Sequence, residues 1–289
     1  MQGTGRLAAA IKASRLLSGG LFLLAMLVAA PSGAAPPTTA TLTATYVISI
    51  GGLTVGRADV KSRFNDKGYA AAINGSTWGI SRIVSDARAV LAGSGRIIGD
   101  TIVPASYNLE TAESGFETHV RMAMRGGSVV SVQSDPQLLD APDRVPLTPS
   151  SKQNVVDPVG AFVVALDHPG DMNGERICDR TVRVFDGWVR FDIRLAYKET
   201  KQVSSGGDSY NGDVIVCSAR YVPVAGHRTS RESVQYMADN QRLEVWLAPV
   251  AGTNLMVPYY FLIGTQVGDL TIHARSFVVT GADQQASGE

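Results

Sequence analysis

The sequence predicts a mainly β fold of roughly a dozen short antiparallel strands, arranged as a sandwich or a barrel. Apolar and polar residues alternate in short runs through most of the chain, as they do along half-buried strands. Turn-forming pairs such as Gly51-Gly52, Asp186-Gly187 and Gly268-Asp269 separate these runs. The connections are too short for the crossovers that parallel strands need, and neighbouring strands should therefore be antiparallel.

The first strands follow one another closely. The runs Tyr46–Ile50 and Leu53–Ser62 flank a Gly-Gly pair and predict a hairpin. An Asn-Asp-Lys-Gly turn then leads into a third strand over 69–77. A weakly amphipathic stretch over 80–85 predicts a short helix before the next strand.

The middle of the chain continues the pattern. Alternating runs over 106–113, 116–124 and 129–134 are separated by Glu-Ser-Gly and Gly-Gly. The residues that follow, 135–156, are rich in Pro, Asp and Ser and predict the longest loop.

A helix is predicted over Pro158–His168. Asp157 is suited to cap its first turn, Pro158 stands where a missing N–H has no cost, and Pro169-Gly170 ends the run. The residues in between are almost all apolar. Such a helix must be covered on more than one side.

The stretch CDRTVRVFDGWVRFDIRL, residues 178–195, predicts a β-hairpin. Apolar and charged residues alternate on both sides of Asp186-Gly187, a dipeptide typical of a type I′ turn. Asp186 is then a turn former, and Asp192 a surface partner for neighbouring arginines. Neither aspartate is a candidate catalytic group.

The C-terminal part predicts two further hairpins. The runs 233–237 and 243–247 flank an Asp-Asn turn, and the runs 259–265 and 270–279 flank a Gly-Asp turn. The strands should end there, and a disordered tail is expected over 281–289.

The first 35 residues predict a cleaved signal peptide. Arg6, Lys12 and Arg15 precede a mostly apolar stretch over 16–30, and Ser32-Gly33-Ala34 supplies small residues for cleavage. The apolar stretch is shorter than the roughly 20 residues of a membrane-spanning helix, and no later stretch is long enough. We therefore expect a periplasmic protein without a stable membrane span, in which 36–280 form a single domain.

Charge and cysteine content limit the partners. The signal peptide holds three of the 26 basic residues and none of the 26 acidic ones, which leaves a net charge of about −3. This charge does not favour nucleic acid. The two cysteines, Cys178 and Cys217, lie in an exported chain and predict a disulfide. A metal site is the alternative, but the four histidines are scattered.

No catalytic motif is present. The sequence lacks a G-x-S-x-G elbow, an H-E-x-x-H pair, a phosphate loop and a dinucleotide fingerprint, and it indicates no cofactor and no metal. The densest polar cluster holds Arg220, His227 and Arg228, which together suit a phosphate or carboxylate. The alternative is a strand that enters a tight turn with its arginines in solvent.

Several segments together resemble a known family. The segments VVDPVGAFVVAL, VCSARYVPVAGHR and LEVWLAPVAGTNLMVPYYFLIGTQVGDLTI are similar to the DUF3108-like family of exported bacterial proteins, a domain of unknown function. That family in turn resembles the lipoprotein carriers LolA and LolB. This resemblance implies a curved antiparallel half-barrel sheet with a few short helices against its concave face, around an apolar cavity.

The resemblance implies binding of an apolar or lipid-like ligand without catalysis, or a role in envelope assembly with a protein partner. The expected walls of the cavity are the helix over Pro158–His168 and apolar strand residues. Two alternatives stay open: a hydrolase-type enzyme that uses the same cavity, and a structural protein with a closed core. The candidate ligand-binding residues are Phe162, Val163, Leu166, Phe191, Trp246 and Phe261.

Overall fold

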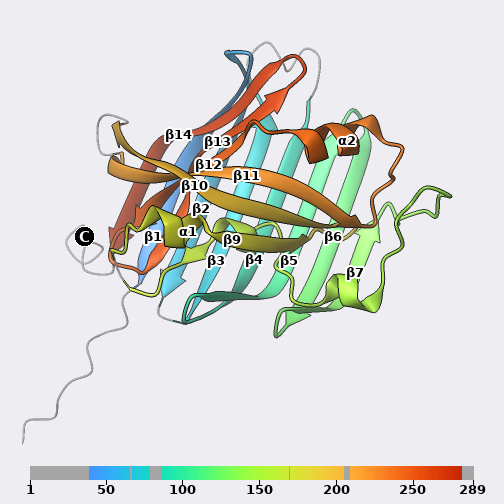
Figure 1. Ribbon diagram of the computed structural model, residues 1–289, viewed down its shortest axis with the longest axis horizontal. Coiled ribbons are helices and arrows are strands. Elements are labelled where there is room, and N and C mark those ends of the chain that lie inside the picture. Colours follow the sequence, from blue (N-terminus) through green and yellow to red (C-terminus); the bar gives the residue numbers. More distant parts are fainter. Residues whose placement is uncertain (1–38, 66, 79–85, 169, 205–208, 282–289) are drawn as a thin grey trace, which may run out of the picture. The chain divides into compact units, whose positions relative to one another are not determined.

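One antiparallel sheet contains every strand that the structure describes (Figure 1). The structure is a computed structural model, and it describes residues 39–65, 67–78, 86–168, 170–204 and 209–281. Its 14 strands include β8, which pairs with β13 and lies off the main order. The two edge strands of that order, β7 and β9, do not pair, so the sheet is not closed. The predicted mainly β, open half-barrel class is confirmed.

The N-terminal half of the sheet is a meander of seven consecutive strands joined by tight turns. Gly-Gly turns at Gly51-Gly52 and Gly126-Gly127 have positive φ at both positions, as a type I′ turn requires. The strands are β1 (Ala40–Ile50), β2 (Leu53–Asn65), β3 (Gly68–Thr77), β4 (Arg88–Ile98), β5 (Thr101–Glu113), β6 (Phe116–Arg125) and β7 (Ser128–Asp135).

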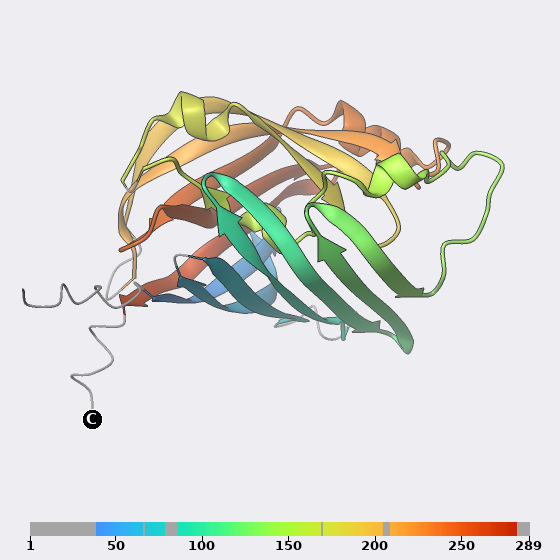
Figure 2. The ribbon, with the colours of Figure 1, turned by 90° about the horizontal axis from the view of Figure 1, so that it is seen from below.

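The C-terminal half is a second meander, which runs back from β14 to β9. Figure 2 shows β9, β10 and β11 arching over the strands of the N-terminal half. The strands are β8 (Val164–Ala165), β9 (Arg180–Phe185), β10 (Arg190–Ser204), β11 (Asn211–Ala225), β12 (Leu243–Val250), β13 (Leu255–Thr265) and β14 (Gly268–Gly281).

Strands β1 and β14 join the two halves. They pair from Ala40 opposite Gly281 to Ile50 opposite Leu270, with one irregularity between Thr45 and Tyr46. The first and last strands along the chain therefore lie side by side in the middle of the sheet. The two edge strands, β7 and β9, come from the middle of the chain.

The long loop predicted over 135–156 is observed over 136–157, where it runs between the two edges. Its one helical element is a 3₁₀ turn, η2 (Pro149–Lys152). Val155 donates its N–H to Gly127 O at the β6–β7 turn (2.9 Å), and Val156 donates to Arg183 O on β9 (2.8 Å). The loop thus connects the two edges by backbone hydrogen bonds while the strands themselves stay apart.

The prediction of a helix over Pro158–His168 is wrong. Only Gly160–Phe162 forms a 3₁₀ turn, η3, and Val164–Ala165 then forms β8. Strand β8 pairs with Leu255 and Met256 of β13, where both of its residues are buried. An apolar run without a polar stripe fits a fully buried strand as well as a buried helix.

The prediction of a strand over 233–237 is wrong as well. This stretch lies in α2 (Glu232–Asp239), which ends at the buried Asn240. The Asn240 side chain donates to Gly264 O (2.8 Å) and accepts from Arg242 N–H (2.8 Å). These bonds stop the helix and lead into β12.

The predicted hairpin at 178–195 is present, but its turn has four residues. Phe185 pairs with Arg190, and Asp186 N–H donates to Val189 O. The Asp186 side chain accepts from Trp188 N–H and Val189 N–H, each at 2.8 Å. Asp186 is the turn former that the sequence predicts, and Asp192 pairs with Arg190.

Other predictions fall outside the described residues. The helix over 80–85, the signal peptide up to residue 35 and the tail beyond 281 are among them. The domain boundaries at 36 and 280 stay predictions. None of the described helices is both long and apolar enough to cross a membrane.

The segment around η3 lies directly on the N-terminal half of the sheet. A Cβ built on Gly93 of β4 would stand 2.6 Å from the Cβ of Val159, whereas one on Gly75 of β3 would meet its nearest atoms at 3.9 Å. We expect Gly93→Ala to lower the free energy of unfolding by about 1–3 kcal/mol, because the added methyl group would overlap the buried Val159 side chain and force it to shift.

Gly75→Ala is the matched control, since it adds the same methyl group to a neighbouring strand. It should be neutral, or stabilise by up to about 1 kcal/mol through the unfolded state. Urea unfolding of both variants checks this result. Equal changes in the free energy of unfolding for the two variants would mean that Val159 does not pack closely against Gly93 of β4.

Candidate functional site

Two apolar chambers lie between the sheet and the segment 158–164. The first chamber has a volume of about 160 Å³ and lies among β1, β2, β3, β13 and β14. The second has a volume of about 260 Å³ and lies among β9 to β13, with α2 beside it. Among the described residues that line the first chamber, only Ser62 and Tyr46 have polar side-chain atoms, and the Tyr46 hydroxyl donates to Pro258 O (2.5 Å).

Phe162, Pro258 and Phe261 line both chambers. The rings of Phe162 and Phe261 lie 5.5 Å apart at 60°, a tilted pair. Phe162 is nevertheless 37% exposed although its segment is otherwise largely buried. The two rings thus stand between the chambers, and part of the Phe162 ring has no protein neighbour.

The structure places four of the six predicted ligand-binding residues at the chambers. Phe162 and Phe261 line both, Val163 lines the first and Phe191 lines the second. The remaining two lie elsewhere in the fold. Leu166 lines neither chamber, and it is buried with the disulfide in an apolar cluster that borders the second chamber at Val164 and Leu247.

Trp246 lies on the other face of β12. Its ring stacks on Tyr260 with centroids 4.4 Å apart, and Lys201 lies 4.6 Å above it. Its neighbour Val245 lines the second chamber, and successive residues of a strand point to opposite faces.

Sequence reasoning missed several chamber residues that a period of two would have marked. On β1, Leu42, Tyr46 and Ile48 share one face and line the first chamber. On β10, Ile193 and Leu195 continue the face of Phe191 into the second chamber. The predicted site was centred on the segment 158–168, and the strands supply most of the wall.

A buried carboxylate fixes the segment that separates the chambers. Asp157 is fully buried, and its Oδ1 accepts from Val159 N–H (2.9 Å) and Gly160 N–H (3.1 Å). The Tyr69 hydroxyl reaches Oδ2 at 3.5 Å. Burial raises the pKa of Asp157 from 3.8 to about 6, although the hydrogen bonds lower it. Burial is the main cause that raises the pKa of Tyr69, and the Asp157 carboxylate raises it further.

The second buried carboxylate, Asp186, has the same role at the β9–β10 turn. Burial raises its pKa, and the hydrogen bonds from Val189 and Trp188 oppose that effect. Neither Asp157 nor Asp186 is a lining residue of the two apolar chambers. Both act as caps of local backbone, and the arrangement gives neither a substrate-facing position.

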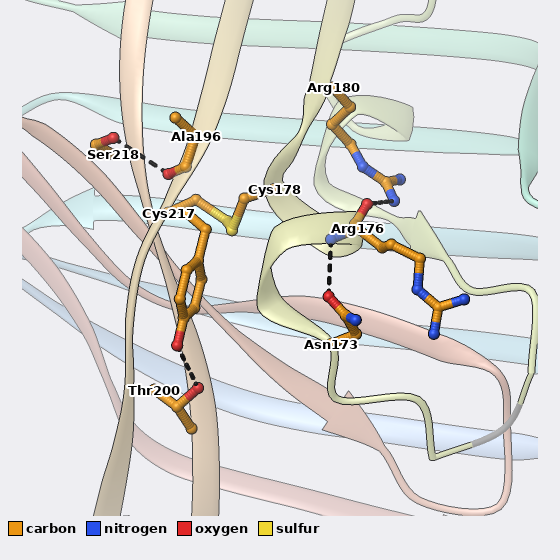
Figure 3. Close-up of a disulfide and its surroundings, with 9 residues drawn as sticks. Asn173, Arg176, Cys178, Arg180, Ala196, Thr200, Cys217 and Ser218 are labelled. Atoms are coloured by element: carbon orange, nitrogen blue, oxygen red, sulfur yellow. Dashed lines mark hydrogen bonds between the residues drawn. A yellow bond between two sulfur atoms is a disulfide. The ribbon is translucent and has the colours of Figure 1, made fainter.

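The predicted disulfide is present. Cys178, the last residue of α1 (Gly174–Cys178), is bonded to Cys217 on β11, and both are fully buried (Figure 3). It holds α1 over the face of the sheet that includes Ile215 and Leu247. Within the described part of the chain, no group of three His, Cys, Asp or Glu residues gathers as a metal site would require.

The three residues of the predicted anion site have different partners. Arg220 donates to Asn240 O at the end of α2 (3.2 Å), and Arg228 pairs with Asp143 (2.8 Å). His227 Nδ1 is buried without a hydrogen-bond partner among the described residues. No hydrogen bond or ion pair between described residues joins the three side chains to one another.

Two comparisons with known proteins found a match. The model of a family described as "Protein of unknown function (DUF3108)" matches residues 45–275, a span that reaches from β1 to β14. Among solved structures, the chain is similar to a "Beta-barrel-like Protein of Domain of Unknown Function DUF1849 from Brucella abortus". That match has 9% identity and a TM-score of 0.46, and it covers 84% of this chain and 98% of the other. None of the curated proteins matches this chain.

Proposed function

This chain belongs to the DUF3108 family of proteins of unknown function, and from that premise we propose that it binds an apolar, lipid-like ligand in the two chambers without catalysis. The ligand would lie along Phe162 and Phe261, which the chambers share. In this proposal the sheet is a rigid container and the segment 158–164 is its inner wall.

The observation that supports the proposal most strongly is the pair of adjoining apolar chambers. Protein interiors are normally packed so closely that voids larger than a water molecule are few. An engineered apolar cavity of about 150 Å³ stays dry and accepts benzene. The chambers here, of about 160 and 260 Å³, have similar walls and are as large or larger. Apolar pockets of this kind favour a hydrocarbon ligand.

We place this function in the periplasm. The disulfide between Cys178 and Cys217 supports that location, because disulfides persist in oxidising compartments. The charged and apolar pattern of the first 35 residues supports it as well. An envelope protein would be the natural partner for delivery of such a ligand, and the near-neutral charge gives no reason to expect nucleic acid.

The test begins with the wild-type protein purified from the periplasm. We expect mass spectrometry of its organic extract to detect co-purified lipid, and a fluorescent fatty acid to bind the delipidated protein. Phe162→Ala should change that affinity several-fold and lower the free energy of unfolding by less than about 2 kcal/mol, since the ring is already partly exposed.

Phe116→Ala is the matched control, because this ring is 81% exposed on the surface. It should alter neither stability nor binding. The closed-core alternative makes the opposite prediction: no lipid-like probe binds the wild type, and Phe162→Ala loses about 3–5 kcal/mol. Turnover of an ester probe that Phe162→Ala abolishes would favour the hydrolase alternative.

A further inference from the structure

A polar cavity adjoins both apolar chambers. It has a volume of about 380 Å³ and is lined by the β4–β5 turn, the β6–β7 turn, the segment 154–164 and the start of β9. Asp100 is the acidic residue in its wall, and Arg180 and Arg183 are the basic ones. Basic groups therefore outnumber acidic groups in this cavity.

Arg180 is the most unusual of these residues. Its Nε is buried and has no hydrogen-bond partner among the described residues. Among the residues that the structure describes, its Nη2 donates only to Arg176 O, at 3.5 Å (Figure 3). Burial lowers the pKa of Arg180, and the charges of Asp100 and Asp167 partly oppose that effect. A guanidinium stays charged in proteins, and a buried donor left without an acceptor is unfavourable.

The wall between this cavity and the apolar chambers is thin. Val163 lines both the polar cavity and the first chamber. Ala161, Val164 and Val182 line both the polar cavity and the second chamber. A ligand that fills a chamber is therefore separated from the polar cavity, here called the Arg180 cavity, by the thickness of one side chain.

We infer that the Arg180 cavity receives the anionic headgroup of an amphiphile whose hydrocarbon chain occupies the apolar chambers. The inference rests on the proposed function and specifies its ligand class. A carboxylate or a phosphate would accept from the Nε and Nη atoms of Arg180 as a bidentate pair, which supplies the missing acceptor. A neutral ligand of the same length leaves that donor unpaired.

Two ligands of equal chain length test the inference: dodecanoic acid and dodecan-1-ol. Titration calorimetry should show that the wild type binds the acid at least about tenfold more tightly, the ratio expected of one hydrogen bond to a charged group. Arg180→Gln should weaken binding of the acid by about the same factor and leave the affinity for the alcohol unchanged. Arg180→Lys should recover part of the loss, because it keeps the charge without the fork.

Arg194→Gln is the matched control, since Arg194 is exposed on the neighbouring strand β10. It should change neither affinity. Dodecyl phosphate and inorganic phosphate separate the possible sources of the anion: tighter binding of dodecyl phosphate than of both inorganic phosphate and dodecan-1-ol supports an amphiphile, and equal binding of the two phosphates overturns it.

Equal affinity of the wild type for acid and alcohol, or an equal loss of both in Arg180→Gln, refutes the headgroup site and leaves the proposed function intact. If neither ligand binds, the proposed function itself fails, and the headgroup site fails with it.

Discussion

The protein is expected to lose about 3 kcal/mol of its free energy of unfolding as the pH rises from about 4 to about 6, and Asp157→Asn is expected to remove that loss. The pKa of Asp157 is raised from 3.8 to about 6 in the fold, chiefly by burial. Below pH 3.8 the carboxyl is protonated in both states, and its full contribution to stability is present. Between the two pKa values only the unfolded chain ionises, so stability falls with rising pH.

The difference between the wild-type and Asp157→Asn stability curves isolates this contribution from those of other groups. Asp143→Asn is the control, because hydrogen bonds from Ser230 and Arg228 hold the pKa of Asp143 well below its usual range. Its contribution is present above the unfolded pKa and is lost at lower pH, which is the opposite sign. A flat difference curve for Asp157→Asn between pH 4 and 6 would contradict the buried, raised carboxyl.

Asp157→Ala separates the hydrogen bonds from the charge. An asparagine retains an acceptor for Val159 N–H and Gly160 N–H, and an alanine leaves both unpaired and buried. We therefore expect Asp157→Ala to be about 2–4 kcal/mol less stable than Asp157→Asn. This expectation exceeds the roughly 1 kcal/mol of an exposed helix cap, because the side chain is fully buried.

Loss of the Cys178–Cys217 disulfide is expected to lower the free energy of unfolding by about 4 kcal/mol. The bond spans 39 positions, and the chain-entropy model assigns about this value to a loop of that length. Urea unfolding of the double variant Cys178→Ala/Cys217→Ala, compared with the wild type, measures the effect. The alanines avoid burying a hydroxyl at either position.

A reducing agent gives the control for this pair. It should destabilise the wild type by a similar amount and leave the double variant unchanged. Without reductant, thiol alkylation of the native protein should add no label, because the structure has no free cysteine. Two labels on the folded wild type would show that the bond does not form.

The sequence predicted most of the hairpins well, because their turns carry local information. At Gly51-Gly52 and Ser114-Gly115 both residues have positive φ, and only a few residue types tolerate that conformation. Asp186-Gly187 carries the same signal but only Gly187 has positive φ. There the Asp186 carboxylate binds two backbone N–H groups, and a four-residue turn replaces the two-residue one.

The segment after Asp157 was predicted less well, because its conformation depends on partners far away in the chain. The cap at Asp157 was recognised correctly, since its carboxylate accepts from Val159 and Gly160. The continuation was not, because Val164–Ala165 finds a strand partner in β13, some ninety residues further on. Local propensity gives way to such a pairing.

Four of the six predicted ligand-binding residues line the chambers, and whether they bind a ligand stays a prediction. Phe191 and Phe261 follow the period of two along their strands, and that period placed them on the chamber face. Trp246 was expected at the chamber, but it lies one position after Val245 and therefore points to the opposite face of β12. Arg220 and Arg228 are close in sequence, but an extended strand carries them towards different partners, Asn240 and Asp143.

The seam between β1 and β14 sets the order in which this sheet can assemble. Each meander consists of contacts between chain neighbours, whereas the seam pairs Ala40 with Gly281, almost the full described length apart. Closing so long a loop costs entropy before the paired strands return any stability. The seam therefore gives the fold a high contact order, and the two meanders should form early and join late. Until they join, Tyr46 and Ala274, which face each other across the seam, remain exposed to aggregation.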